Sequence, residues 1–249
     1  MDHKTKEILS LITPEAKKVM ETIWFTADLH HGHPKIVSIC NRPVYVDQKI
    51  VDEFKLKHID DPEYDINKDK EYLRNYVDPL HTEWLIKEVF NKWVKKKDTV
   101  YIIGDLTFAK HSDAERFLDR LNGNKFMILG NHDKNIDKSS RFSQITQIKD
   151  FTFSQFGLNI HIVLCHYPMV SWNRKPHGSW HLYGHTHGRY KHPDLAFDIG
   201  IDNMDLHTLP GGGWRPINLY EVCQIMSEKS NQLDENLLYR DFGLNISEV

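Results

Sequence analysis

Five short polar motifs constrain the fold of this chain more than any other feature, because most of them directly follow an apolar run. The motifs are Asp28-Leu29-His30, Gly104-Asp105, Gly130-Asn131-His132-Asp133, His166 and Gly184-His185-Thr186-His187. Apolar and β-branched residues at 23–26, 100–103, 126–129 and 160–164 predict strands just before the first four. Because polar groups at strand ends gather at one edge of an α/β sheet, we expect these motifs to form one shared metal site.

The size and composition of the chain are typical of a single soluble α/β domain. With 249 residues it can bury one substantial core, and we predict one domain over residues 1–249. The sequence has no apolar stretch long enough for a membrane span, and its N-terminus lacks a signal-peptide pattern. The three cysteines are few and widely spaced, which indicates reduced thiols and a cytoplasmic location.

The charge balance argues against general binding of nucleic acid. The net charge of −3 gives the whole molecule no strong attraction to a polyanion. A local basic groove remains an alternative, and six residues are candidates for it: Arg42, Lys55, Lys57, Arg174, Lys175 and Arg189.

Helical spacing and capping residues predict helices between the strands. Thr13-Pro14-Glu15 combines an N-cap residue with a proline in the first turn, so a helix should run from there to Met20. Apolar periodicity predicts an amphipathic helix over 84–93, packed on a sheet. Further helices are expected at 47–58 and 112–121, and further strands at 196–201 and 217–220.

The stretch at about 40–80 differs in character from the rest of the chain. It is dense in charge between residues 60 and 78 and is interrupted by Pro62 and Pro79. We interpret it as an insertion that forms a surface lobe or lid and governs substrate choice. The alternative for residues 60–69 is a charged, solvated loop.

Taken together, the five motifs resemble those of the calcineurin-like metallophosphoesterase superfamily. The match runs in order from Asp28 to His187 and is closest to a subgroup of small bacterial and phage-type phosphoesterases. The resemblance implies a four-layered α/β/β/α sandwich with a dinuclear metal site at the strand ends.

The same resemblance assigns a role to each motif residue. It implies that one ion is held by Asp28, His30 and His187, a second by Asn131, His166 and His185, and both by a bridging Asp105. Two divalent ions are therefore expected as cofactors. Nitrogen and oxygen donors without thiolate suit manganese, iron, zinc, nickel or magnesium, and we favour manganese. Such a pair lowers the pKa of a shared water, so that hydroxide can attack phosphorus in line.

Four other residues are candidates for catalysis or substrate binding. By resemblance, His132 stabilises the transition state or protonates the leaving group, and Asp133 orients the imidazole of His132. His33 could contact the substrate phosphate, with a structural turn as the alternative. Arg42 could hold a phosphate through two N–H groups, with a surface salt bridge as the alternative.

These features predict an enzyme that hydrolyses small phosphodiesters, of nucleotide type or otherwise. Gly104-Asp105 is followed by Leu-Thr-Phe rather than by the basic motif of the superfamily's protein phosphatases, which argues against that activity. One alternative is a nuclease acting on single-stranded or structured nucleic acid. A second is a non-catalytic scaffold, although scaffolds of this fold tend to lose ligands that this chain retains. The sequence does not reveal the oligomeric state.

Overall fold

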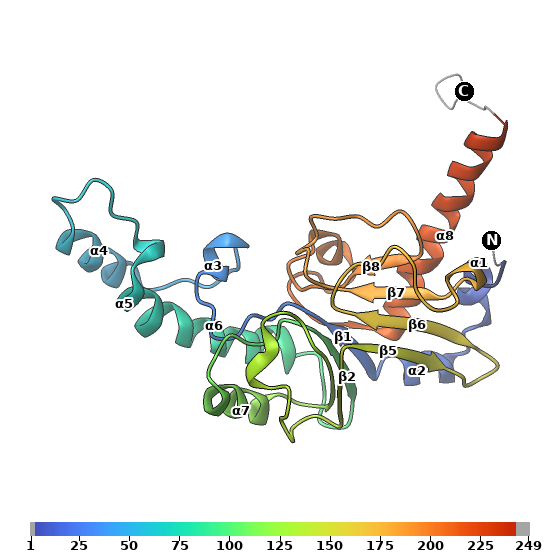
Figure 1. The fold of residues 1–249 in the computed structure, drawn as a ribbon, viewed down its shortest axis with the longest axis horizontal. Coiled ribbons are helices and arrows are strands. Elements are labelled where there is room, and N and C mark those ends of the chain that lie inside the picture. The colour runs from blue at the N-terminus through green and yellow to red at the C-terminus, as the bar shows by residue number, and fades with distance from the viewer. Residues whose placement is uncertain (1–2, 243–249) are drawn as a thin grey trace.

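The computed structural model describes residues 3–242, which form a mixed α/β fold with two β-sheets (Figure 1). The first sheet has the order β4-β3-β2-β1-β9 and the second the order β5-β6-β7-β8. The strands of the first sheet are Ile23–Thr26 (β1), Thr99–Ile103 (β2), Asn124–Ile128 (β3), Gln144–Thr146 (β4) and Ile217–Asn218 (β9). Those of the second are Ile148–Phe153 (β5), Ile160–Cys165 (β6), Trp180–Tyr183 (β7) and Ala196–Asp198 (β8).

Parallel pairing brings the motifs to one edge of each sheet. Strands β1, β2 and β3 are mutually parallel neighbours, and β6 is parallel to β7. Their carboxyl ends therefore point the same way within each sheet. The first three motifs follow β1, β2 and β3, and the last two follow β6 and β7.

Alternation along the strands builds the core between the two sheets. Tyr101 and Ile103 of β2 share one apolar cluster with Ile162 of the second sheet, whereas Val100 and Ile102 face the opposite side. On that side they pack against helices Leu85–Phe90 (η3) and His111–Arg120 (α7). Each isoleucine so buried contributes roughly 1.5–3 kcal/mol to folding.

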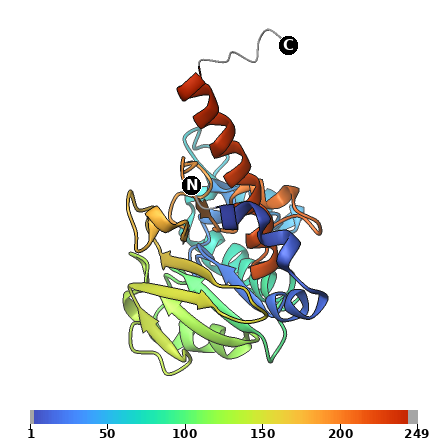
Figure 2. The same ribbon diagram turned by 90° about the vertical axis from the view of Figure 1, so that its right-hand side faces the viewer.

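Three further helices close the core. Helix Pro14–Met20 (α2) is capped by Thr13, which accepts a hydrogen bond from the N–H of Ala16. Helix His3–Leu11 (α1) lies against the long helix Leu219–Phe242 (α8) (Figure 2). Met20 and residues from the first turns of α8 join the cluster between the sheets. Over residues 3–242, no helix is both long enough and apolar enough to cross a bilayer.

Residues 36–77 form a lobe that projects away from the sheets (Figure 1). The lobe has its own small apolar cluster, centred on Phe54, Tyr72, Leu73 and Val77. Its elements are Ile36–Ile39 (α3), Gln48–Lys57 (α4), Ile66–Lys68 (η1), Lys70–Tyr72 (α5) and the π-helical Leu73–Val77 (η2). Asp78–Trp84 (α6) then continues the chain directly into η3 beneath the first sheet.

Most predicted elements are confirmed, and the differences have local causes. Residues 70–78, for which no helix was predicted, are helical, and Tyr72, Leu73 and Val77 are buried in the lobe. Strand β8 ends at Asp198, because Gly200 pairs instead with Ala27 of the other sheet. Residues 219–220 begin α8 and do not extend β9.

Candidate metal centre

The motif residues lie in two groups at the edge where the strand ends meet. The ligand atoms of Asp28, His30 and His187 lie within 4.8 Å of one another, and so do those of Asp105, His166 and His185. We call Asp28, His30 and His187 the closed half and Asn131, His166 and His185 the open half. Asp105 lies between the halves: its Oδ2 is 3.4 Å from Nε2 of His166 and 3.9 Å from Nε2 of His30. One carboxylate thus faces both groups, the position that a bridging ligand requires.

Asn131, the predicted ligand that is neither histidine nor aspartate, lies beside the open half. Its Oδ1 is 3.5 Å from the hydroxyl of Tyr167, the residue after His166. The backbone N–H of the next residue, His132, donates to Oδ1 of Asp105 at 3.1 Å. The third motif is therefore tied to the bridging position, and the seven predicted ligands all belong to one neighbourhood.

The backbone of the predicted ligands is unusual. Five of the seven have positive φ angles, namely Asp28 at 59°, His30 at 54°, Asp105 at 51°, His185 at 70° and His187 at 49°. Residues other than glycine adopt this left-handed region at a cost and do so only where the surrounding fold imposes it. Such strained positions cluster at functional sites.

The glycines in the motifs allow the ligands to approach one another. A Cβ atom on Gly104, which has φ of +83°, would lie 2.1 Å from Nδ1 of His166. A Cβ on Gly130 would lie 2.4 Å from Oδ1 of Asp105. Neither backbone nor a packed imidazole can give way by that much. Glycine is therefore required in the Gly-Asp and Gly-Asn motifs because each of these motifs lies in close contact with another one.

The imidazoles direct their free nitrogens toward the centre of the cluster. Nδ1 of His166 is 3.0 Å from the carbonyl of Ile103, while its buried Nε2 has no hydrogen-bond partner. Nδ1 of His187 is 2.8 Å from Asp202, and its Nε2 faces Nε2 of His30 at 3.3 Å. An Nδ1 hydrogen-bonded on the outer side with Nε2 directed toward the other ligands is the arrangement of metal-bound histidine. The donor set thus fits divalent cations.

The shifted pKa values of the clustered acids and imidazoles are also consistent with a cation site. Burial raises the pKa of Asp28 to about 8, although the nearby His166 and His187 oppose the shift. Burial lowers the pKa of both imidazoles, but the carboxylates around them outweigh it and raise the values to about 9 for His166 and about 10 for His187. The cluster therefore retains protons near neutral pH. Divalent ions bind such sites by displacing protons.

Arg42 holds the closed half in place from behind. Its guanidinium is buried and makes five hydrogen bonds: two to the carboxylate of Asp202, one to Nε2 of His81, and one each to the carbonyls of Asp28 and Leu29. These contacts use all five N–H donors of the side chain. The predicted contact of Arg42 with substrate phosphate is therefore wrong for this structure, and its salt bridge is buried rather than on the surface.

Two residues near the closed half were missed by the sequence analysis. Asp202 bonds to both Arg42 and His187, and Sγ of Cys40 lies 3.7 Å from Nδ1 of His187. Asp202 follows an apolar stretch, Ile199-Gly200-Ile201. Polar residues directly after apolar runs were the signal for Asp28 and Asp105, and the same signal could have identified Asp202. Cys40 had no such signal, because it comes from the lobe.

His132 and Asp133 are neighbours with separate roles. Asp133 is buried and accepts hydrogen bonds from the backbone N–H groups of Asp105, Leu106 and Gly130. It therefore braces the turn that carries Asp105 and does not orient the His132 ring as predicted. That ring stacks on Phe108 with centroids 3.9 Å apart, and its Nε2 is 3.9 Å from Oδ2 of Asp105.

His33 lies on the other side of Phe108. The two ring centroids are 4.4 Å apart, and the centroid of His33 is 5.7 Å from that of His30. Its buried Nδ1 has no hydrogen-bond partner. The structure thus places His33 next to the closed half, which leaves its predicted contact with a phosphate open.

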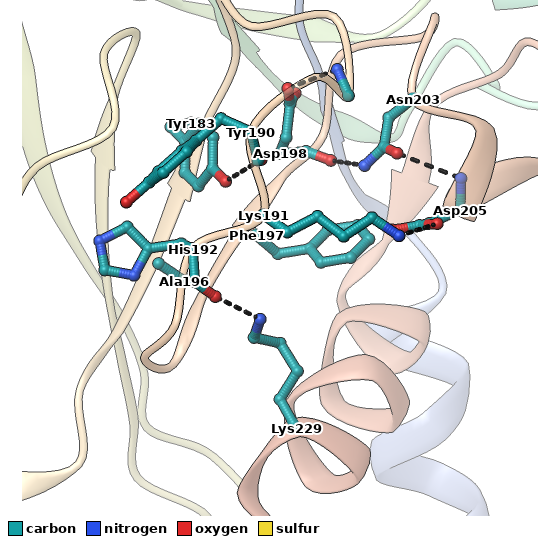
Figure 3. A pocket seen from close by; sticks show the side chains of 11 residues that line it. Tyr183, Tyr190, Lys191, His192, Ala196, Phe197, Asp198, Asn203, Asp205 and Lys229 are labelled. Carbon is teal, nitrogen blue, oxygen red and sulfur yellow. Dashed lines mark hydrogen bonds and ion pairs between the residues drawn. The ribbon is translucent and has the colours of Figure 1, made fainter. Parts of the chain in front are cut away.

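The last motif is anchored by Asp198, at the end of β8. One carboxylate oxygen of Asp198 accepts from the hydroxyl of Thr186 and from the N–H of Gly188. Figure 3 shows the small cavity behind this loop, where Lys191 pairs with Asp205 and Lys229 donates to the carbonyl of His192. Its volume of about 40 Å³ is far below that of a typical ligand site. We interpret this region as support for His187.

The six basic residues considered for a nucleic-acid groove do not line one surface. Arg42 is buried, and Lys175 is paired with Asp194. Arg174 lines a cavity at the amino ends of β6 and β7, opposite the metal centre. Lys55 and Lys57 lie on α4 in the lobe. The predicted groove is not formed by this set.

Comparison with known proteins gives relatives but no activity. No family model matches the chain. An uncharacterized protein of Methanocaldococcus jannaschii is 27% identical, and the match covers 84% of this chain and 93% of that protein. The Gene 66 protein of Mycobacterium phage D29 is 25% identical over 68% of this chain and 80% of its own length. A crystal structure of a protein of unknown function from Aquifex aeolicus covers 82% of this chain and 98% of its own, with a TM-score of 0.49 and 18% identity.

Proposed function

We propose that this protein is a metal-dependent phosphoesterase that hydrolyses small phosphodiesters. The main support for this proposal is that the Asp105 carboxylate faces two groups of nitrogen and oxygen donors. The proposal includes the four-layered sandwich and the dinuclear site that the motif resemblance implies. It also includes the assignment of the seven ligands to two divalent ions, manganese being favoured.

The ions would supply an activated water and would offset the negative charge of the phosphoryl group. In this proposal the closed half holds one ion deep in the protein, since Asp28 and His30 are buried. The open half presents the other to substrate, since Asn131 and His185 are exposed. Asp105 keeps the two sites at a fixed separation.

His132 is the residue best placed to handle the leaving group. Its side chain is 39% exposed, so a substrate can reach it, and its stacking on Phe108 limits the orientation of the ring. Proton transfer by a positioned imidazole contributes roughly 10²–10⁴-fold to a rate. We therefore assign His132 to protonation of the leaving oxygen. Asp133 serves this step indirectly, by holding the Asp105 turn.

Hydrolysis of bis-p-nitrophenyl phosphate tests the proposal. The protein is stripped with a chelator, reloaded with each candidate ion and assayed with and without metal. We expect metal-dependent turnover and about two bound ions per chain by elemental analysis. Asp105→Asn keeps the acceptor for the His132 N–H but loses the bridging charge. It should lose most of the bound metal and at least about 10³-fold in rate.

Two further variants separate catalysis from metal binding. His132→Asn should retain both ions and lose about 10²–10⁴-fold in turnover. His161→Asn is the matched control, because His161 lies at the start of β6, away from the metal centre. It should keep both properties. An Asp105→Asn protein with the metal content and rate of the unmodified chain would refute the proposal.

A further inference from the structure

A second feature lies beside the open half: a cavity of about 600 Å³. This volume is in the range of sites that hold a small organic ligand. Gly130 and Asn131 of the third motif line it, and so do Ile148, the first residue of β5, and Tyr167, which lies just beyond the end of β6. The cavity is therefore next to the open half, where the phosphate of a substrate would lie in the proposed function.

Tyr167 connects the cavity to the metal centre. Its ring meets the imidazoles of His166 and His185 edge-on, with centroids 5.0 and 4.9 Å away and interplanar angles of 71° and 67°. Its side of the cavity is open, since the residue is 44% exposed. A group attached to a phosphate at the open half would thus meet this ring first.

The lining of the cavity favours an uncharged, flat ligand. Ile148 is 53% exposed and adds a second large apolar side chain, while Cys165 and Leu129 supply more sheltered apolar contact. Two large apolar side chains exposed at one cavity next to a polar site indicate a ligand-binding surface.

The charged groups of the cavity do not make it an anion site. Lys134 and Asp137 contribute one charge of each sign. The carboxylate of Asp133 is already occupied by backbone N–H groups. Gln147 offers an exposed amide that can both donate and accept a hydrogen bond. An aromatic heterocycle with polar edges matches this combination.

We propose that this cavity binds the nucleobase of a small nucleoside phosphodiester, with Tyr167 as the stacking surface. The inference rests on the proposed function, because the phosphate of the same molecule would lie at the metal centre. Every base has a π-face, so stacking on tyrosine gives affinity for nucleosides without strong choice among bases.

A matched pair of substrates tests the proposal. The p-nitrophenyl ester of thymidine 5′-phosphate and methyl p-nitrophenyl phosphate share one leaving group, and only the first carries a nucleoside. We expect the unmodified protein to prefer the nucleoside diester. Tyr167→Leu should reduce the ratio of the two kcat/KM values by roughly tenfold, mainly through KM, whereas Tyr167→Phe should keep it. Phe156→Leu is the control, because Phe156 is an aromatic residue of similar exposure that lies in the loop between β5 and β6, at the end of the second sheet opposite the motifs.

Direct binding separates failure of this proposal from failure of the proposed function. Calorimetry compares thymidine 5′-monophosphate with methyl phosphate in the manganese-treated protein, without turnover. If the nucleotide binds more tightly than methyl phosphate in a way that depends on Tyr167, but neither diester is hydrolysed, the nucleobase site would stand. The proposed phosphodiesterase activity would then be rejected. Equal binding of the two ligands, or an equal loss of both activities in Tyr167→Leu, would reject the nucleobase site.

Discussion

The two halves of the candidate metal centre differ in how the protein holds them. In the closed half, Asp28 and His30 are buried, and a network in which Arg42 joins Asp202 to the backbone of Asp28 fixes the group. In the open half, His166 is buried, but His185 and Asn131 are exposed, and Asn131 lines the 600 Å³ cavity. The closed half is thus built into the folded core, whereas two of the three residues of the open half are accessible from solvent.

The largest expected effect comes from breaking the network of the closed half. Arg42→Met leaves the buried Asp202 carboxylate without its arginine partner, and loss of one member of a buried ion pair costs about 3–5 kcal/mol. Urea unfolding of the metal-free protein should show this decrease in the free energy of unfolding. Arg42→Lys should also be destabilised, because lysine cannot make the forked contact. A decrease in the free energy of unfolding of less than about 1 kcal/mol would mean that the Arg42–Asp202 pair contributes no more than a typical surface ion pair.

A pH-dependent effect of intermediate size is expected at His31, which lies behind the closed half. His31 stacks on Phe117 with centroids 4.0 Å apart and contacts the hydroxyl of Thr107. Burial lowers its pKa from 6.5 to about 4, with Asp113 opposing the shift. The unfolded chain therefore binds a proton between pH 6.5 and 4 that the folded protein does not, so stability present above pH 6.5 is lost as the pH falls.

This loss should amount to about 1–2 kcal/mol between pH 7 and pH 5. The measurement is urea unfolding at both pH values for the unmodified protein and for His31→Asn, whose amide can still contact Thr107. The variant should show a smaller difference between the two pH values. An unchanged difference would assign the acid sensitivity to other groups.

The smallest effect on stability is expected in the open half. His185→Ala removes an exposed side chain, so the free energy of unfolding of the metal-free protein should change by no more than about 0.5 kcal/mol. Its effect on metal should be large, because the open half loses a donor. Manganese titration should then show one tightly bound ion and one weakened by at least about 10–100-fold. Equal weakening of both ions would mean that the two halves do not bind metal separately.

The order of residues was sufficient to predict the strands, the motif residues and the sheet edge where the motifs meet. Apolar runs followed by polar motifs were sufficient, because parallel strands bring their carboxyl ends to one edge. The same rule also covers Asp202, although it was not applied there. The helix over residues 70–78 was not predicted, because its dense charge hides the apolar residues that the lobe buries.

The surroundings of Arg42, Asp133 and Tyr167 depend on how the folded chain packs. A guanidinium, a carboxylate or a tyrosine ring near a motif can face substrate or brace the backbone, and the sequence contains no measure of which. Only folding fixes how many hydrogen-bond partners surround each group. Arg42 and Asp133 are fully engaged by backbone and side chains inside the protein, whereas Tyr167 is left exposed beside the cavity. Burial and hydrogen-bond saturation are properties of the packed chain, which is why they could not be read from residue order.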